Sequence, residues 1–220
     1  MTRRKPVSLL GVICLSLLLA ACIPRLPDPP HDVDSGSVPL AERQTAEAFF
    51  NDTMPRYVSI IEEVAVEAGG TLGFYEEPGR SRCGVSSKGY EISRVRYYIP
   101  LIDYEDLRRI VGNGARRYGY VYSSDPEPRG VRNIRSVGLG DQDGNSLLFD
   151  HAEDDVIFVE FSTGCLPSVR PADVLERIQL PAPQELFPRL TVVEAYNANK
   201  QKNPAIFRQE ATGDDGQSGS

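Results

Sequence analysis

Residues 56–70, RYVSIIEEVAVEAGG, carry the clearest secondary-structure pattern in the chain. Apolar side chains recur there at intervals of three and four residues, at Tyr57, Ile60, Ile61, Val64, Ala65 and Ala68. This spacing places them on one face of an α-helix. Thr53 is a suitable N-cap, Pro55 suits the first turn, and Gly69-Gly70 ends the pattern. The stretch therefore predicts a helix that packs one side against the rest of a domain.

The segment before this helix has a shorter apolar face, formed by Ala46, Phe49 and Phe50. Pro55 lies between the two patterns and cannot donate a backbone hydrogen bond. Residues 41–68 therefore form either two helices or one helix kinked at Pro55.

A second helix is predicted to begin at Asp103, with acidic residues in its first turn, and to end at Gly119. Carboxylates are favourable near a helix N-terminus, and glycine is favoured just past the C-terminus. Its apolar stripe consists of Leu107, Ile110, Val111, Ala115 and Tyr118. Gly112 and Gly114 each weaken the helix by about 1 kcal/mol relative to alanine, so its stability must come from packing.

Alternating apolar and polar residues predict the strands. They are expected at 71–77, 91–99, 131–139, 146–150 and 156–163, with shorter elements at 120–122 and 191–195. Loops are expected at 78–89, which contains Cys83, and at 123–130, which contains two prolines, and a short helix is expected at 172–178. This order predicts an α+β fold: a two-layer sandwich in which an antiparallel sheet of about five strands carries two main helices on one face.

The first 22 residues, MTRRKPVSLLGVICLSLLLAAC, have the features of a bacterial lipoprotein signal peptide. A basic start is followed by an apolar run that is short for a membrane-spanning helix, and then by small residues before a cleavage site. Cys22 follows Leu-Ala-Ala and completes a lipobox, so we expect it to carry the lipid. A signal peptide with a chance cysteine, or a short uncleaved anchor helix, would also contain such an apolar run.

The domain organisation follows from composition. We expect a signal peptide at 1–21, a Pro-rich tether at 22–44, a single α+β domain at 45–200 and a disordered polar tail at 201–220. The net charge of the chain is −7; without the three cations of the signal, 21 basic against 31 acidic residues remain, a net charge of −10. This balance argues against nucleic acid as a partner. The expected location is the extracytoplasmic face of the cell membrane, reached through the lipid anchor.

Two cysteines remain after the apolar run and the lipobox are set aside. Cys83 and Cys165 would lie in an oxidising compartment, where a disulfide is the default. A metal pair and a reactive thiol are the alternatives, although two cysteines without a nearby histidine make a poor metal site.

Catalytic and metal motifs are weak. The only histidines are His31 and His151, and the chain has no G-x-S-x-G motif. Asp141, Asp143 and Asn145 resemble part of a calcium loop, but Asp143-Gly144 is also a strong hairpin-turn signal. We therefore expect no catalytic residues, no metal and no cofactor.

The binding candidate is a surface of the strand at 91–99. Alternation places Arg94, Arg96 and Tyr98 on one face, opposite Val95, Tyr97 and Ile99. Tyrosine combines apolar area with a polar tip, which suits sugar or protein contacts, although tyrosines also occur in strands for packing alone. If the C-terminal segment covers this face, the candidate fails.

Several segments together resemble the LppA-like lipoproteins of mycobacteria and related actinobacteria. They are the lipobox and tether and, within residues 45–166, the segments RYVSIIEEVAVEAG, GFYEEP, SRCG, DYEDLRRIV to YGY, and STGC. The resemblance implies a surface-exposed, lipid-anchored domain with a Cys83–Cys165 disulfide and no established catalytic activity.

The expected function is therefore that of a lipid-anchored envelope lipoprotein without catalytic activity, which binds a protein or a cell-envelope ligand. One alternative is a carrier that holds an apolar or lipid ligand in a cavity between the helices and the sheet. A hydrolase is the other.

Overall fold

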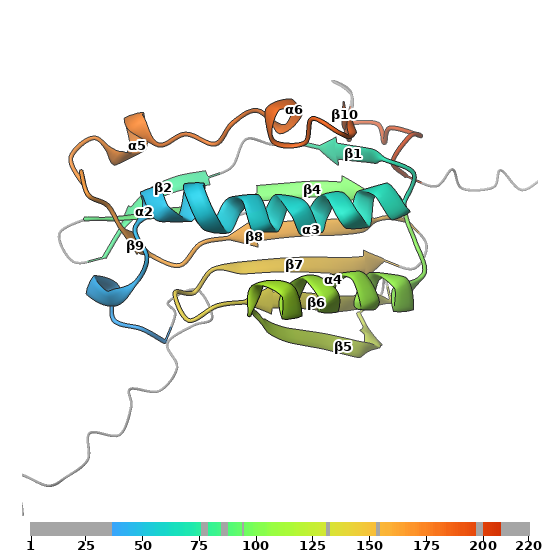
Figure 1. Ribbon diagram of the computed structural model, residues 1–220. Coiled ribbons are helices and arrows are strands. Elements are labelled where there is room, and N and C mark those ends of the chain that lie inside the picture. Colours follow the sequence, from blue (N-terminus) through green and yellow to red (C-terminus); the bar gives the residue numbers. More distant parts are fainter. Residues whose placement is uncertain are drawn as a thin grey trace, which may run out of the picture. The chain divides into compact units, whose positions relative to one another are not determined.

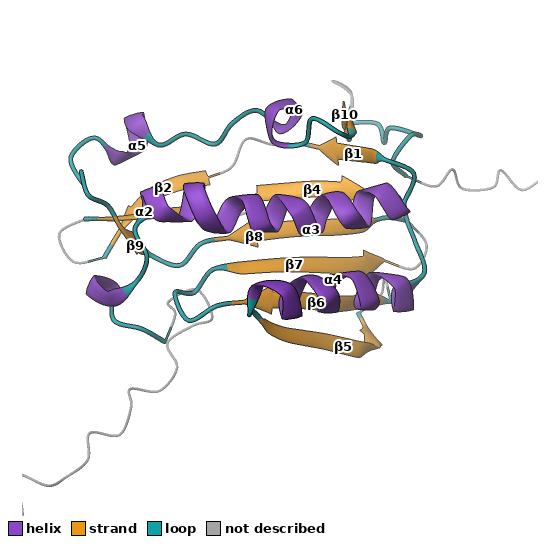
Figure 2. Cartoon of the chain, viewed as in Figure 1, coloured by secondary structure: helices purple, strands orange, loops and turns teal. Residues whose placement is uncertain are grey.

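A seven-stranded sheet forms the body of the domain (Figures 1 and 2). The computed structural model describes residues 37–75, 79–84, 88–93, 95–130, 133–152, 155–196 and 200–207. The sheet order is β10 (Thr191–Glu194), β1 (Thr71–Phe74), β4 (Val95–Ile99), β8 (Ile157–Ser162), β7 (Ser146–Ala152), β6 (Ile134–Gly140) and β5 (Val121–Arg129). All neighbours are antiparallel except β1 and β10, which are parallel.

A second, three-stranded sheet consists of β2 (Gly79–Cys83), β3 (Gly89–Ser93) and β9 (Leu166–Pro167). The long helices α3 (Met54–Glu67) and α4 (Tyr104–Tyr118) lie on one face of the main sheet (Figure 1). The short helices are α2 (Ala46–Ala48), α5 (Val174–Arg177) and α6 (Pro183–Leu186). The α+β class and the helices on one face are as expected, whereas the main sheet has more strands than the five predicted.

The helical segment around Pro55 is one run rather than two helices. A π-helical turn, Phe49–Thr53, connects α2 to α3, and Pro55 occupies the first turn of α3. Thr45 provides the N-cap, since its side chain accepts a hydrogen bond from Ala48 N. The prediction that Thr53 caps the helix is wrong, because Thr53 already has helical backbone angles.

Helix α4 begins and ends where the sequence predicts. The Asp103 carboxylate accepts a hydrogen bond of 2.8 Å from Glu105 N, and Gly119 ends the helix with a φ of 76°. Leu107 and Val111 on its apolar stripe have no exposed surface. Local capping signals were sufficient here because both ends are made by adjacent residues.

The main core fills the space between the two helices and the sheet. The inward-facing strand residues include Tyr97, Ile99, Phe149, Ile157, Val159 and Phe161, all with at most 3% of their surface exposed. Ile60 and Ile61 of α3 pack against them with no exposed surface. The period-2 pattern of β4 and β8 therefore predicted correctly which side chains face the helices.

A smaller core lies on the opposite face of the sheet. Tyr98 and Val156 pack there with Ala195, Ile206 and Phe207 of the C-terminal segment. The prediction of a disordered tail from residue 201 is therefore wrong for 201–207, because two apolar side chains anchor that segment. Residues 208–220 lie outside the described residues.

Two predicted loops are strands. Residues 79–83 pair with β3, and residues 121–129 pair with β6 at the sheet edge. Neither segment alternates in polarity. Strand β5 also contains two prolines, which cannot donate a backbone hydrogen bond; an edge strand tolerates them because it pairs with a neighbour on one side only.

Candidate functional site

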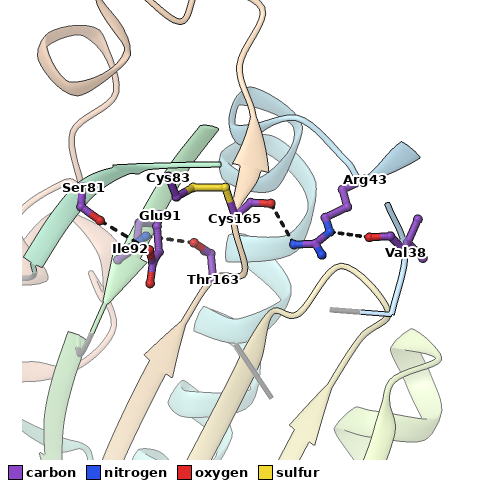
Figure 3. The surroundings of a disulfide bond; sticks show 8 residues. All are labelled: Val38, Arg43, Ser81, Cys83, Glu91, Ile92, Thr163 and Cys165. Atoms are coloured by element: carbon purple, nitrogen blue, oxygen red, sulfur yellow. Dashed lines mark hydrogen bonds between the residues drawn. A yellow bond between two sulfur atoms is a disulfide. The ribbon is translucent and has the colours of Figure 1, made fainter. Parts of the chain in front are cut away.

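A disulfide between Cys83 and Cys165 confirms the expected pairing. It joins the end of β2 to the loop that leads from β8 into β9 (Figure 3). The bond consumes both thiols, so neither the metal pair nor the reactive thiol describes this structure.

Strand β3 passes close to the disulfide and has no room for a side chain at Gly89. A Cβ atom there would lie 2.4 Å from the Sγ of Cys165 and 2.8 Å from that of Cys83. Ile92 lies three residues after Gly89, and Thr163 lies two residues before Cys165. These two residues exchange hydrogen bonds: Ile92 N donates to Thr163 Oγ1 at 2.9 Å, and Thr163 N donates to Ile92 O at 3.0 Å. The disulfide thus links the end of β2 to the chain after β8, next to the hydrogen-bonded residues Ile92 and Thr163 (Figure 3).

The last residues assigned to the tether belong to this part of the domain. Arg43 donates from Nε to Val38 O at 2.7 Å and from Nη1 to Cys165 O at 3.1 Å (Figure 3). Ser37 N and Val38 N both donate to Gln142 O. Gln44 N donates to the Asp143 carboxylate. The predicted tether boundary at 44 is therefore wrong, because residues 37–44 are hydrogen-bonded to the domain. Cys22 and residues 1–36 lie outside the described residues.

A groove of about 500 Å³ lies beside β1 and β4, at the end where Phe74 pairs with Tyr97. Its lining comes from β1, β2, β4 and the segment between α5 and α6: Phe74, Tyr75, Arg80, Val95, Tyr97, Gln179, Leu180, Pro181, Ala182, Pro183 and Gln184. The lining is thus mainly aromatic and apolar, with two amides and one cation. Grooves of this size and character are typical of small-ligand sites.

Arg80 is fixed in position at the groove by α5 and the residue that follows it. Its Nη1 donates to Leu175 O at 3.3 Å and to Ile178 O at 3.4 Å. Tyr90 OH also donates to Ile178 O, at 3.3 Å. Burial raises the pKa of Tyr90 to about 12, and the positive charge of Arg80 opposes that rise. Both side chains therefore hold this segment against β2 and β3.

The predicted binding face of β4 is not an open surface. Tyr98 is 5% exposed and packs against Phe158, Tyr196 and Phe207. Arg96 is exposed and pairs with Glu160 at 3.0 Å, whereas Arg94 lies outside the described residues. The candidate of Arg94, Arg96 and Tyr98 fails as a shared exposed face because the C-terminal segment covers its aromatic member.

The opposite face of the same strand contributes to the groove instead, through Val95 and Tyr97. Sequence reasoning placed both residues on the packed face but missed the groove. Its other walls come from distant parts of the chain, and no local pattern brings Gln184 next to Tyr75.

The other sequence candidates have structural partners. The Asp141 carboxylate accepts hydrogen bonds from Asp143 N, Asn145 N and Asn145 Nδ2, as expected for a turn. Burial raises the pKa of Asp141. His151 is buried, with its Nε2 2.8 Å from Ile102 O.

The described residues contain neither a metal-binding cluster nor a membrane-spanning helix. No group of three or more metal-ligating side chains occurs in the described ranges. Nor does any helix in that part of the chain have the length and hydropathy needed to cross a membrane.

The fold and site define a class: a two-layer α+β domain with a disulfide at one end and a groove beside β1 and β4 of its main sheet. The chain belongs to the family described as a domain of unknown function, DUF4853, whose model matches residues 42–174. No curated protein matches the chain.

The chain is also similar to a solved structure, a DUF4853 family protein from the actinobacterium Actinomyces odontolyticus ATCC 17982. The two share 27% sequence identity with a TM-score of 0.62, over 76% of this chain and 93% of the other. This similarity agrees with the family assignment.

Proposed function

We propose that the protein is an exported lipoprotein, anchored through Cys22, whose folded domain binds a cell-envelope ligand without catalysing a reaction. The observation that carries the proposal is the Cys83–Cys165 disulfide. Disulfides persist in oxidising compartments outside the cytoplasm, which is where the lipoprotein signal would deliver the domain. The segments quoted above also support a relationship to the LppA-like lipoproteins.

The anchor is tested with two cysteine variants. In Cys22→Ser the lipid acceptor is lost, so the N-terminal peptide should carry no lipid when it is examined by mass spectrometry, and the membrane fraction should retain less of the protein. Cys14→Ser changes a cysteine of the same apolar run and should stay acylated. Equal membrane retention of both variants would show that Cys22 is not the anchor.

The groove supports the binding role better than the carrier alternative. A carrier needs a cavity between the helices and the sheet, but Ile60, Leu107 and Val159 meet there with no exposed surface. The groove instead opens beside β1, where Tyr75 is 39% exposed. The proposal that the domain catalyses no reaction is supported by His151, because its ring is buried and its Nε2 is hydrogen-bonded to the Ile102 carbonyl.

The binding role is tested by photo-crosslinking in native membranes. A crosslinking amino acid at Tyr75 should give a specific adduct, identified by mass spectrometry of lipids, glycans and proteins. The matched control is Tyr122, a tyrosine of similar exposure, 37%, on the opposite edge of the sheet. Identical products at both positions, or none at Tyr75, would contradict a ligand site at the groove.

A further inference from the structure

Among the residues that the structure describes, one side chain brings a charge to the groove. Arg80 is the one charged residue among the described residues that line it. Within the described ranges, Arg80 takes part in none of the ion pairs. The two hydrogen bonds to Leu175 and Ile178 use Nη1, which leaves the Nε and Nη2 edge of the guanidinium for a ligand. That edge has the geometry that binds a carboxylate through two parallel hydrogen bonds.

The remaining lining suits a ring that has both C–H faces and polar substituents. Tyr75, Pro181 and Pro183 present apolar surfaces, and Gln184 presents an exposed amide that both donates and accepts hydrogen bonds. Gln179 Nε2 donates to Glu176 O at 3.2 Å, so this residue offers its amide oxygen as an acceptor. A hydrocarbon chain that covered the Gln184 amide would remove its hydrogen bonds to water without replacing them, at a cost in free energy. A sugar ring satisfies both kinds of surface, because its C–H face packs on tyrosine and proline while its hydroxyl and acetamido groups reach the amides.

We propose that the groove binds a sugar that carries a carboxylate, with the carboxylate on the Nε–Nη2 edge of Arg80 and the ring between Tyr75 and the segment 179–184. This deepens the binding role proposed above and does not depend on the anchor. The chain offers a close control for Arg80. Arg82 lies two residues along the same strand and donates from Nη2 to Ala172 O at 2.5 Å, but it does not line the groove.

The test uses two sugars that differ in the carboxylate. N-acetylmuramic acid is N-acetylglucosamine with a lactyl ether, so it adds one carboxylate to the same ring. Calorimetric titration of the full-length protein in detergent should show saturable binding of N-acetylmuramic acid and binding of N-acetylglucosamine that is weaker by about tenfold or more. Acetate should bind more weakly than the acidic sugar, because it lacks the ring.

The variants locate the site. Arg80→Gln should weaken binding of N-acetylmuramic acid by about tenfold or more, whereas Arg82→Gln should change it by less than about twofold. Gln184→Ala removes an exposed amide, and it should also weaken binding while leaving the melting temperature unchanged. This second variant keeps the test decisive if Arg80→Gln loosens the contact of α5 and Ile178 with β2. Equal binding of the two sugars, equal binding of acetate, or equal effects of the two arginine variants would overturn the proposal. Absence of binding would overturn it too, while a crosslinked product at Tyr75 would still uphold the broader binding role.

Discussion

The rings of Tyr98 and Phe207 lie 5.8 Å apart, on the face of the main sheet that the helices leave uncovered. Phe207 also contacts Tyr196, with 5.1 Å between ring centroids, and is 3% exposed. Tyr98, which the sequence placed on the candidate binding face, is therefore part of a second, smaller core.

Removal of the Phe207 ring should expose that core. We expect Phe207→Ala to lower the free energy of unfolding by about 3 kcal/mol, since aromatic truncation loses both buried area and packing contacts. Urea unfolding followed by tyrosine fluorescence measures the change. Val121→Ala, at a side chain 74% exposed on the opposite edge strand, should change stability by less than about 0.5 kcal/mol. An unchanged urea midpoint for Phe207→Ala would mean that the C-terminal segment does not hold this face.

Two glycines of α4 should respond to alanine with opposite signs. At Gly112 the nearest atom to an added Cβ is 3.7 Å away, an ordinary contact, so Gly112→Ala should stabilise the protein by about 1 kcal/mol. At Gly114 the Cβ would lie 2.6 Å from the Cγ1 of Ile60, which is fully buried, so Gly114→Ala should destabilise it by about 1–3 kcal/mol. Thermal unfolding of both variants is the measurement, and shifts of the same sign would show that contact between α3 and α4 at Gly114 is not close.

The disulfide should contribute a large part of the stability. It closes a loop with a sequence separation of 82, and the chain-entropy model gives about 4–5 kcal/mol for a loop of this length. We expect the Cys83→Ser, Cys165→Ser double variant to lose about that amount in urea unfolding, and the reduced parent protein to behave similarly. If reduction left the unfolding midpoint in place, the bond would have no role in stability.

The stability of the α2 end should depend on pH through Glu47. Its carboxylate accepts hydrogen bonds from Arg177 Nη2 at 2.7 Å, Ser168 Oγ at 2.9 Å and Val169 N at 3.4 Å. Burial raises its pKa, but these hydrogen bonds, with Arg177 foremost, outweigh burial and lower the pKa below its ordinary value of 4.5. A carboxyl group with a lowered pKa stabilises the folded state above its ordinary pKa, and that contribution is lost as pH falls through the lowered value.

Glu47→Gln should therefore cost about 1 kcal/mol at pH 7 and make little difference at a pH well below the ordinary value, where the parent carboxyl group is also neutral. Urea unfolding as a function of pH gives both numbers. Glu105→Gln is the control, because Glu105 pairs with Arg108 with 72% of its side chain exposed and should have a smaller effect. A constant difference between Glu47→Gln and the parent at all pH values would exclude the carboxylate as its source.

Local signals in the sequence predicted the elements whose ends and faces are made by neighbouring residues. Asp103 and Gly119 fix α4, and the alternation along β4 correctly separates Tyr97 from Tyr98. What alternation could not tell is which side of the strand remains open. That depends on Phe207, which reaches Tyr98 from the far end of the chain.

The same reason explains the missed strands and the missed groove. Strand β2 is mostly exposed. Arg82 and Arg80 bond the backbone carbonyls of Ala172, before α5, and of Ile178, after it, and such contacts leave no trace in hydropathy. Residues 37–44 also looked like linker because their partners, Gln142 and Cys165, are backbone carbonyls far along the chain.

The parallel pairing of β1 with β10 has a consequence for the order of folding. Thr71 lies opposite Thr191, so the strand that follows the first long helix finds its outer partner only near the end of the domain. Contacts between residues so distant in sequence are slow to form, because the entropy of closing the intervening loop must be overcome first. When the chain is synthesised from its N-terminus, the backbone groups along one edge of β1 must wait for their β10 partners until residues 191–194 have been made. The pairing of β1 with β10 can therefore form only after almost the whole domain has been made.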